Sequence, residues 1–285
     1  MSVGGEKVQS LIWDEVAEAD NPFAAAECFC CGYDVYGDLL GKTSWFEYLY
    51  LLITQNRPSK QQARLLELLA VGIANPGPRD HSVRAAMNAG VAGSTYASCL
   101  MAALGVGAGQ LGGAQDVSQA MQIWQQCGFD LDAWRDSLTG KTAGEIDDIW
   151  SPIEHPPGFD PHGVSCTKPV RQLLELLALN SEGNTLAWLE HHRDALEVVA
   201  QCPLSISGVA AAAFVDLQLS PAQGEMVYLW LRLPGAAAHA LEQEKVGWRN
   251  YPFFGLDVHL AGDPGPYHRK VQEKIANEEN LGVCA

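Results

Sequence analysis

The chain has 285 residues, which suits one large domain or two modest ones. Hydrophobic residues make up 47% and charged residues 18%, so the chain can bury a sizeable core and is not disordered as a whole. The net charge of −16 argues against nucleic acid or an anionic membrane as the main partner, because phosphate binding needs clustered Lys and Arg. We therefore expect no nucleic-acid partner and no membrane partner.

The cysteines and the N-terminus indicate a reduced, cytoplasmic protein. Residues 1–20 lack the apolar stretch of a secretory signal, and the eight Cys are spread over a long chain, which is unlike a disulfide framework. Three of them lie close together, Cys28, Cys30 and Cys31, but a metal site usually has CxxC pairs or His partners at set spacing. We expect thiols and no metal.

The hydrophobic period predicts helices along nearly the whole chain and little strand. Ser44 and Glu47 match the pattern of a capping box before an apolar run. Residues 85–115 carry no charge, but they are small, which favours a buried helix pair over a membrane span. The expected helices, in chain order, are 45–53, 60–74, a pair within 83–104, 114–126, 131–138, 169–180, 184–201, 208–219, 221–245 with an interruption at Pro234-Gly235, and 267–279.

Two segments without helical period lie between these helices. Residues 105–113 form a glycine-rich connector. Residues 151–167 contain four prolines together with His155 and His162. A loop of that length within a compact domain is usually functional or disordered.

Four segments, in the correct order over residues 30–252, resemble motifs of the citrate synthase superfamily, including the citryl-CoA lyase module of ATP-citrate lyases. Gly32–Val35, Ser44–Leu52 and Arg57-Pro58 are similar to "RGYDI … SFEEVAYLL … LP"; Leu111–Ala114 to "HGGA"; Pro157–Phe159 with His162 to "PGFGHPV"; and Arg232–Gln243 to "RxxGxxAHxxEQ". The sequence Ala213–Asp216 matches the lyase branch well.

The resemblance implies an all-α, citrate synthase-like fold with a large and a small helical domain and a cleft between them. The large domain would comprise residues 1–110 and 215–285, and the small domain residues 111–214. The resemblance also implies a homodimer or a higher homo-oligomer, with the small-residue helices at 83–104 packed at the dimer interface.

The chain departs from the family at positions that carry chemistry. The family uses an Asp to remove a proton next to a CoA thioester, and other groups hold the enolate oxygen and grip the keto acid. Aligned on the motifs, that Asp falls at Ser207, the substrate-binding His at Pro76, and the enolate-side His at Leu111, where citryl-CoA lyases also carry an apolar residue. Because losing a general base costs roughly 10²–10⁴-fold in rate, we do not expect ordinary citrate synthesis.

The resemblance also assigns candidate site residues. We predict His162 and Ser207 as catalytic, with Ser207 donating a hydrogen bond to the thioester oxygen. Substrate-binding residues would be Arg232, Arg249, His239 and His81, the last only if its loop is shifted; Gly112 and Gly113 would let the backbone approach a CoA thioester.

Purely structural roles for the same residues also remain open. Arg232 needs an anion, and a ligand carboxylate and a buried acidic side chain are equally good expectations. His239 and Glu242 lie one helical turn apart and are expected to pair with each other. Ser207, like Ser205, has the alternative of a plain helix-start residue.

Two functions of different classes fit these features. The first is an enzyme that makes or breaks a carbon–carbon bond beside a coenzyme A thioester, by aldol or Claisen chemistry, on a non-standard substrate and without a metal. The second is a catalytically impaired protein that binds an acyl-CoA or a carboxylate, or that serves as a regulatory subunit.

Overall fold

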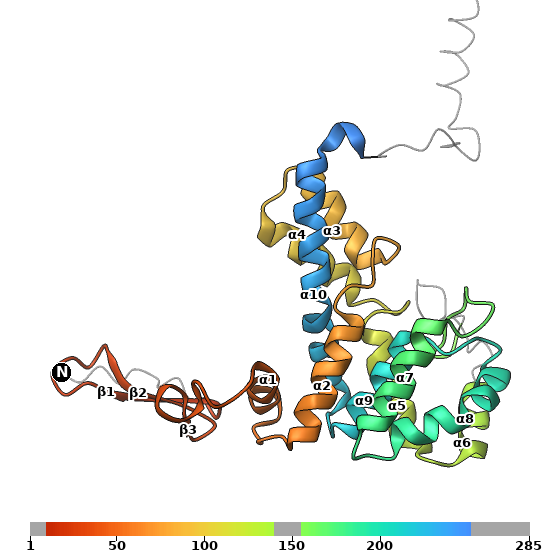
Figure 1. The fold of residues 1–285 in the computed structure, drawn as a ribbon, viewed down its shortest axis with the longest axis horizontal. Helices are drawn as coiled ribbons and strands as arrows, with labels where there is room; N and C mark the ends of the chain where they lie inside the picture. Colours follow the sequence, from red (N-terminus) through yellow and green to blue (C-terminus); the bar gives the residue numbers. More distant parts are fainter. Residues whose placement is uncertain (1–9, 140–154, 252–285) are drawn as a thin grey trace, which may run out of the picture. The chain divides into compact units, whose positions relative to one another are not determined.

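The computed structural model describes residues 10–139 and 155–251. Two compact units contain them, Met1–Lys245 and Val246–Ala285. The described residues are mainly helical, which confirms the predicted fold class (Figure 1). The α-helices are α1 (Trp45–Thr54), α2 (Lys60–Ile73), α3 (His81–Val91), α4 (Tyr96–Gly107), α5 (Ala114–Cys127), α6 (Leu131–Thr139), α7 (Lys168–Asn180), α8 (Thr185–Ala200), α9 (Ile206–Asp216) and α10 (Pro221–Val246).

A small antiparallel sheet near the N-terminus is a feature that the hydrophobic period does not predict. Its strands are β1 (Trp13–Ala17), β2 (Ala25–Cys30) and β3 (Tyr33–Asp34), followed by a short π-helical turn, η1 (Val35–Leu39). All of β1 is exposed, so its sequence shows no alternation of apolar and polar residues. Between β2 and β3, Cys31 and Gly32 both have positive φ, as a two-residue hairpin turn requires.

The start of α1 follows the capping signal in its sequence. At α1 the Ser44 hydroxyl accepts from the Glu47 N–H, and the Glu47 carboxylate accepts from the Ser44 N–H at 2.6 Å, so the predicted capping box is confirmed.

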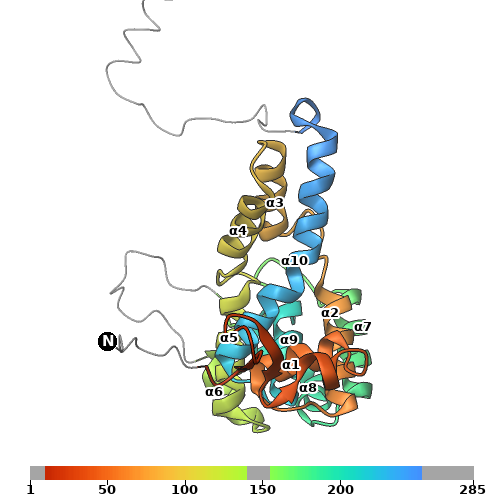
Figure 2. The ribbon, with the colours of Figure 1, turned by 90° about the vertical axis from the view of Figure 1, so that its left-hand side faces the viewer.

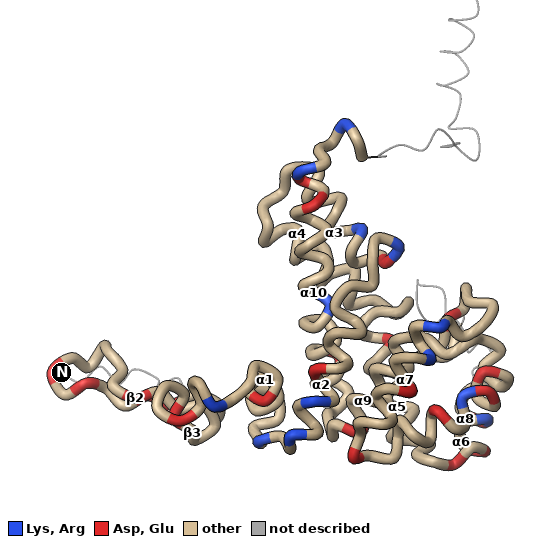
Figure 3. The backbone as a smooth tube through the Cα atoms, viewed as in Figure 1, with Lys and Arg blue, Asp and Glu red and all other residues tan. Residues whose placement is uncertain are grey.

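Around α6 and α8 charges of both signs lie close together (Figure 3), and Arg193 of α8 forms an ion pair with Glu197 at 2.9 Å.

The main hydrophobic core is centred on α9. Residues 209–214 of that helix have no exposed surface, and four of these six residues are alanine. Their small size lets neighbouring helices approach closely. Gly224 of α10, for example, lies so near the Met121 side chain that a methyl group there would be 2.3 Å from its sulfur. The core thereby brings α5, α9 and α10 into one packed region.

A second, smaller core joins α3, α4 and α10, which lie alongside one another in both views (Figures 1 and 2). The predicted pair of small-residue helices is present as α3 and α4. The buried residues of this smaller core are Val83, Ala86, Cys99, Ala103, Ala236 and Ala240. No helix within the described ranges is long and apolar enough to cross a membrane.

The predicted interruption of the last long helix is wrong, because α10 continues through Pro234. Proline lacks an N–H and normally breaks a helix. Here the next N–H, that of Gly235, donates instead to the Ala74 carbonyl at the end of α2, at 2.9 Å. A Cβ on Gly235 would lie 2.3 Å from that oxygen, so glycine is needed for the contact.

The remaining predictions on organisation are not tested. The division into large and small domains stays a prediction, and the expected helix at 267–279 lies outside the described residues. Within the second unit the structure describes a short 3₁₀ turn, η2 (Trp248–Asn250).

Replacing Gly235 with alanine tests the contact between α2 and α10. We expect G235A to lower the free energy of unfolding by about 1–3 kcal/mol, the usual cost of overpacking, because the new methyl group meets backbone that has little freedom to move. Gly105 of α4 is the matched control, since nothing lies within 4 Å of its Cβ position. G105A should stabilise by about 0.4–1 kcal/mol. Urea unfolding measures both, and equal effects would contradict the packing argument.

Candidate functional site

Arg232 is a buried arginine in the middle of α10, with 8% of its surface exposed. Its guanidinium forms an ion pair with Asp80, the N-cap residue of α3. Nη1 also donates to the Gly112 carbonyl at 3.1 Å, and the guanidinium carbon lies 5.0 Å from the centre of the Tyr228 ring. Of the two anions expected for Arg232, the structure therefore contains the acidic side chain.

The glycine-rich connector aims its backbone at this arginine. Gly112 has φ +63°, which favours glycine, and its carbonyl accepts from the Tyr228 hydroxyl at 3.3 Å as well as from Arg232. At Gly113 a Cβ would lie 2.2 Å from the Gly109 carbonyl oxygen. Positive φ thus explains Gly112 and close backbone packing explains Gly113, and their predicted role beside a CoA thioester stays a prediction.

Ser207, in the first turn of α9, is bonded to a carboxylate from another helix. Its hydroxyl donates to Asp116 of α5, and it lies 2.6 Å from the Ser205 hydroxyl. The other oxygen of Asp116 accepts from the Gly158 N–H at 3.1 Å. Asp116 and Ser207 are each 1% exposed. Burial raises the pKa of Asp116 to about 6, although the bonds from Ser207 and Gly158 act in the opposite direction.

His155 is a buried imidazole next to the same carboxylate. Only 7% of its side chain is exposed, and its Nε2 lies 3.8 Å from Asp116 Oδ1 without any hydrogen-bond partner. Burial lowers the pKa of His155, so its neutral form is favoured. Asp160 opposes this shift and His162 adds to it. Unpartnered buried polar atoms are rare in folded proteins, which sets His155 apart.

His162 is exposed, on the segment that follows this histidine. The backbone N–H of His162 donates to the Asp160 carboxylate at 2.9 Å. The loop is tied to the start of α9 by two backbone bonds, from Asp160 N to Pro203 O at 2.8 Å and from Ser205 N to Gly158 O at 3.0 Å. His162 therefore lies on a loop that two backbone hydrogen bonds tie to the segment just before Ser207.

The other predicted substrate-binding residues are His239, His81 and Arg249. His239 contacts Glu242 at 3.1 Å, which confirms their expected pairing, and Asn75 at 3.1 Å through its other nitrogen. His81, next to Asp80, is exposed at the start of α3. In the second unit, the Arg249 guanidinium lies over the Trp248 ring at 5.2 Å. Substrate binding by any of the three stays a prediction.

Tyr228 of α10 donates to the carbonyl of Gly112, which precedes α5 and its Asp116, and the Tyr228 ring lies beside Arg232. It is 2% exposed, and burial raises the pKa of its hydroxyl. The charges of Arg232, Asp80 and Asp116 all act on that hydroxyl. The structure thus brings Arg232, Gly112 and Ser207 into one region built from α3, the connector, α5, α9 and α10.

The sequence predictions missed the acidic members of this region. Neither Asp80 nor Asp116 is among the predicted site residues. Asp116 offered one signal: it shares a helix face with Ala120 and lies next to Val117, so a lone acid occupies an apolar side of α5. The partner of that acid, 91 positions away, had no signal in the sequence.

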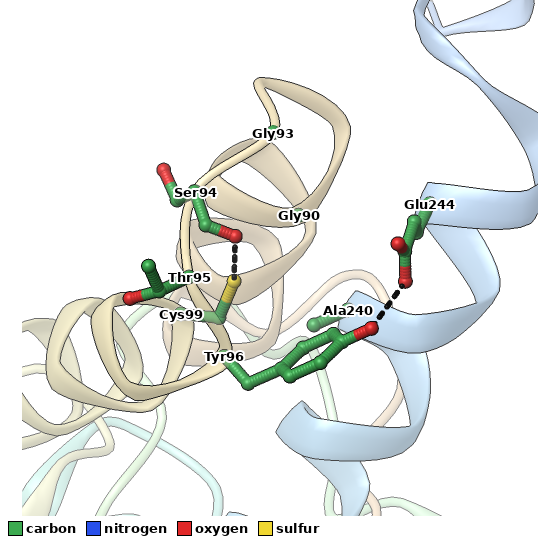
Figure 4. A pocket seen from close by; sticks show the side chains of 8 residues that line it. All are labelled: Gly90, Gly93, Ser94, Thr95, Tyr96, Cys99, Ala240 and Glu244. Carbon is green, nitrogen blue, oxygen red and sulfur yellow. Dashed lines mark hydrogen bonds between the residues drawn. The ribbon is translucent and has the colours of Figure 1, made fainter.

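Two hollows in the first unit have linings that do not include Arg232, Asp116 or Ser207. A cavity of about 270 Å³ is bordered by α3, α4 and α10, where the Tyr96 hydroxyl donates to Glu244 at 3.0 Å (Figure 4). A larger apolar groove of about 790 Å³ is lined by residues of α1, α2, α4 and α10. Among the described residues, no three His, Cys, Asp or Glu side chains come together as metal ligands.

Comparison with known proteins shows which solved structures the chain resembles. No protein-family model matches the chain, and no curated protein matches it. Among solved structures, citryl-CoA lyase from Hydrogenobacter thermophilus matches with a TM-score of 0.71 and 18% identity, over 93% of this chain and 100% of that chain. ATP citrate lyase from Methanothrix soehngenii, solved with citrate and coenzyme A, matches with a TM-score of 0.70 and 18% identity, over 91% of this chain and 42% of that chain.

A more distant match has the same topology. Citrate synthase from Thermotoga maritima MSB8 matches with a TM-score of 0.56 and 17% identity, over 79% of this chain and 60% of that chain. Identities this low establish the fold rather than the activity. The chain has the fold of the citrate synthase superfamily, as its sequence motifs predicted.

Proposed function

We propose that the protein binds a coenzyme A thioester and makes or breaks a carbon–carbon bond beside the thioester carbonyl, without a metal. One observation carries the proposal: Arg232 and Asp116 are both buried, and the charges of both act on the hydroxyl of the same tyrosine, Tyr228. That pair supplies the two things such chemistry needs, a cation for a carboxylate and an acceptor for a proton. A similar fold solved with citrate and coenzyme A supports the choice of ligands.

The predicted residues take the following roles in this proposal. Arg232 binds a carboxylate of the acid substrate, and His162 donates a hydrogen bond to a ligand oxygen from its loop. The thioester lies near Ser207. A ligand carboxylate has to displace Asp80 from Arg232, because that side chain already neutralises the guanidinium.

This last contact also favours a second function, in which the protein binds the ligand without turning it over. An arginine that is already paired binds an anion less readily, and α9 carries a serine instead of an acid at position 207. A binding or regulatory subunit fits both features.

Ligand binding is tested first, with His162. We expect coenzyme A, acetyl-CoA or citrate to raise the melting temperature of the wild type, and H162A to bind roughly tenfold more weakly, about 1.4 kcal/mol, because one hydrogen bond to the ligand is lost. H191A is the matched control, an exposed histidine on α8. Calorimetry measures the affinities. An H162A protein that binds like the wild type would remove His162 from the site.

The competition between Asp80 and a ligand is tested by D80N. Asparagine caps a helix as well as aspartate does, so α3 should stay intact. In D80N, citrate no longer competes with the Asp80 carboxylate for Arg232. We therefore expect D80N to bind citrate about tenfold more tightly than the wild type does. The double variant D80N/R232M should lose this gain. If D80N binds citrate no better than the wild type, Arg232 is structural.

We also propose that the protein is a homodimer that closes the apolar groove. Trp45 of α1 is 64% exposed and Val71 of α2 is 77% exposed, and both line the groove. An exposed apolar surface of this kind marks an interaction site. A second copy is the simplest occupant, since a two-fold interface uses the same patch on both chains.

Light scattering tests the dimer. V71K places a charge in the groove, and we expect it to shift the protein toward monomer, because burying an unpaired ammonium group is costly. Val198 of α8 is 78% exposed and does not line the groove, so V198K is the matched control and should keep the wild-type mass. A dimer unaffected by V71K would place the interface elsewhere.

A further inference from the structure

The hydroxyl of Ser207 and the carboxylate of Asp116 share one hydrogen bond inside the protein. Ser207 is in the first turn of α9, a turn that carries no acid, and Asp116 reaches it from α5. The carboxylate is therefore present at this point of the fold, although it comes from another helix. Ser205, within 2.6 Å, holds the Ser207 hydroxyl from the other direction.

We propose that Asp116 is the proton acceptor of this site and that Ser207 relays the proton to it. The C–H bond next to the thioester carbonyl breaks, and its electron pair moves to the carbonyl oxygen to form the enolate. The proton passes to Ser207 Oγ as the hydroxyl proton of Ser207 passes to Asp116 Oδ2. The assignment rests on the proposed function, since it names the base for that chemistry.

The environment of Asp116 suits such a base. Its pKa of about 6 lies close to neutral pH, where a general base is most effective. The groups that face it are Ser207 from α9 and the Gly158 N–H and His155 from the loop. Through its charge it also acts on the Tyr228 hydroxyl of α10, as do Arg232 and Asp80.

His155 gives an independent indication of a ligand. Its side chain is more than nine-tenths buried, and its Nε2 has no hydrogen-bond partner. A buried polar atom without a partner is costly unless something else supplies one. With its proton on Nε2, His155 would donate a hydrogen bond to an oxygen of the ligand beside Asp116.

The substrate reaches Ser207 only when the loop over it moves. Ser207 is 1% exposed, and Gly158 lies so close to α9 that a Cβ on Gly208 would be 2.3 Å from the Gly158 oxygen. Opening breaks the backbone bonds from Ser205 to Gly158 and from Asp160 to Pro203. The same movement would free the Gly158 N–H from Asp116.

The experiment follows deuterium exchange at the α-carbon of acetyl-CoA in D₂O, together with acetyl-CoA binding. We expect D116N to bind acetyl-CoA like the wild type and to exchange it about 100-fold or more slowly, the typical loss for a general base. D136N, an exposed aspartate on α6, is the matched control and should exchange normally. The wild-type exchange rate should rise with pH and reach half its maximum near pH 6.

A carboxylate swap separates chemistry from structure. The double variant D116N/S207D moves the acid to α9, and we expect it to exchange at least about tenfold faster than D116N. Should D116N fail to fold, S207A tests the relay, with the same expected loss of exchange at unchanged binding.

Three results would overturn the assignment. They are D116N, or S207A in its place, exchanging at the wild-type rate; a folded double variant no faster than D116N; and a wild type that binds acetyl-CoA without exchanging it. The last leaves the binding function in place. A wild type that binds no acetyl-CoA overturns the proposed function itself.

Discussion

A single carboxylate with almost no exposed surface connects three parts of the chain that are far apart in sequence. Asp116 joins its own helix α5 to the start of α9 through Ser207, and to the loop through the Gly158 N–H. Burial raises its pKa from 3.8 to about 6. The folded state therefore holds this proton more tightly than the unfolded state does.

That difference gives Asp116 a defined effect on stability. Between about pH 4 and pH 6 the unfolded chain has lost the proton while the folded chain keeps it, so the contribution of Asp116 falls as the pH rises. Above pH 6 the charged carboxylate of Asp116 therefore lowers the free energy of unfolding by about 3 kcal/mol. A neutral amide at position 116 would avoid this cost but would lack one of the two acceptor oxygens that Ser207 and the Gly158 N–H use.

Arg232 differs from Asp116 in that its charge is already paired inside the protein. The chain carries a net charge of −16, so an anionic ligand approaches against the overall field and needs a local cation. Asp80 stabilises the buried guanidinium in the absence of ligand, and Gly112 and Tyr228 hold it in place. In the proposed function, binding would exchange one carboxylate for another at Arg232, and its free energy would be the difference between two similar ion pairs.

Local features of the fold could be predicted from the sequence, whereas features set by long-range contacts could not. The capping box at Ser44 and the small-residue pair of α3 and α4 depend on neighbours within a few positions, so period and caps identify them. The passage of α10 through Pro234 depends on the Ala74 carbonyl, 161 positions away from Gly235 (235 − 74). The exposed strand β1 has no alternation to reveal it.

The same distinction applies to the chemistry. Counting along the motif finds a serine where the resemblance expects an acid, and a position-by-position comparison then implies a missing base. The fold nevertheless brings a carboxylate to that serine, because the small residues at the start of α9 and in the loop let α5 come close enough for Asp116 to bond Ser207. A catalytic and a merely binding protein therefore differ here in whether a substrate reaches Ser207. The presence of an acid does not separate them.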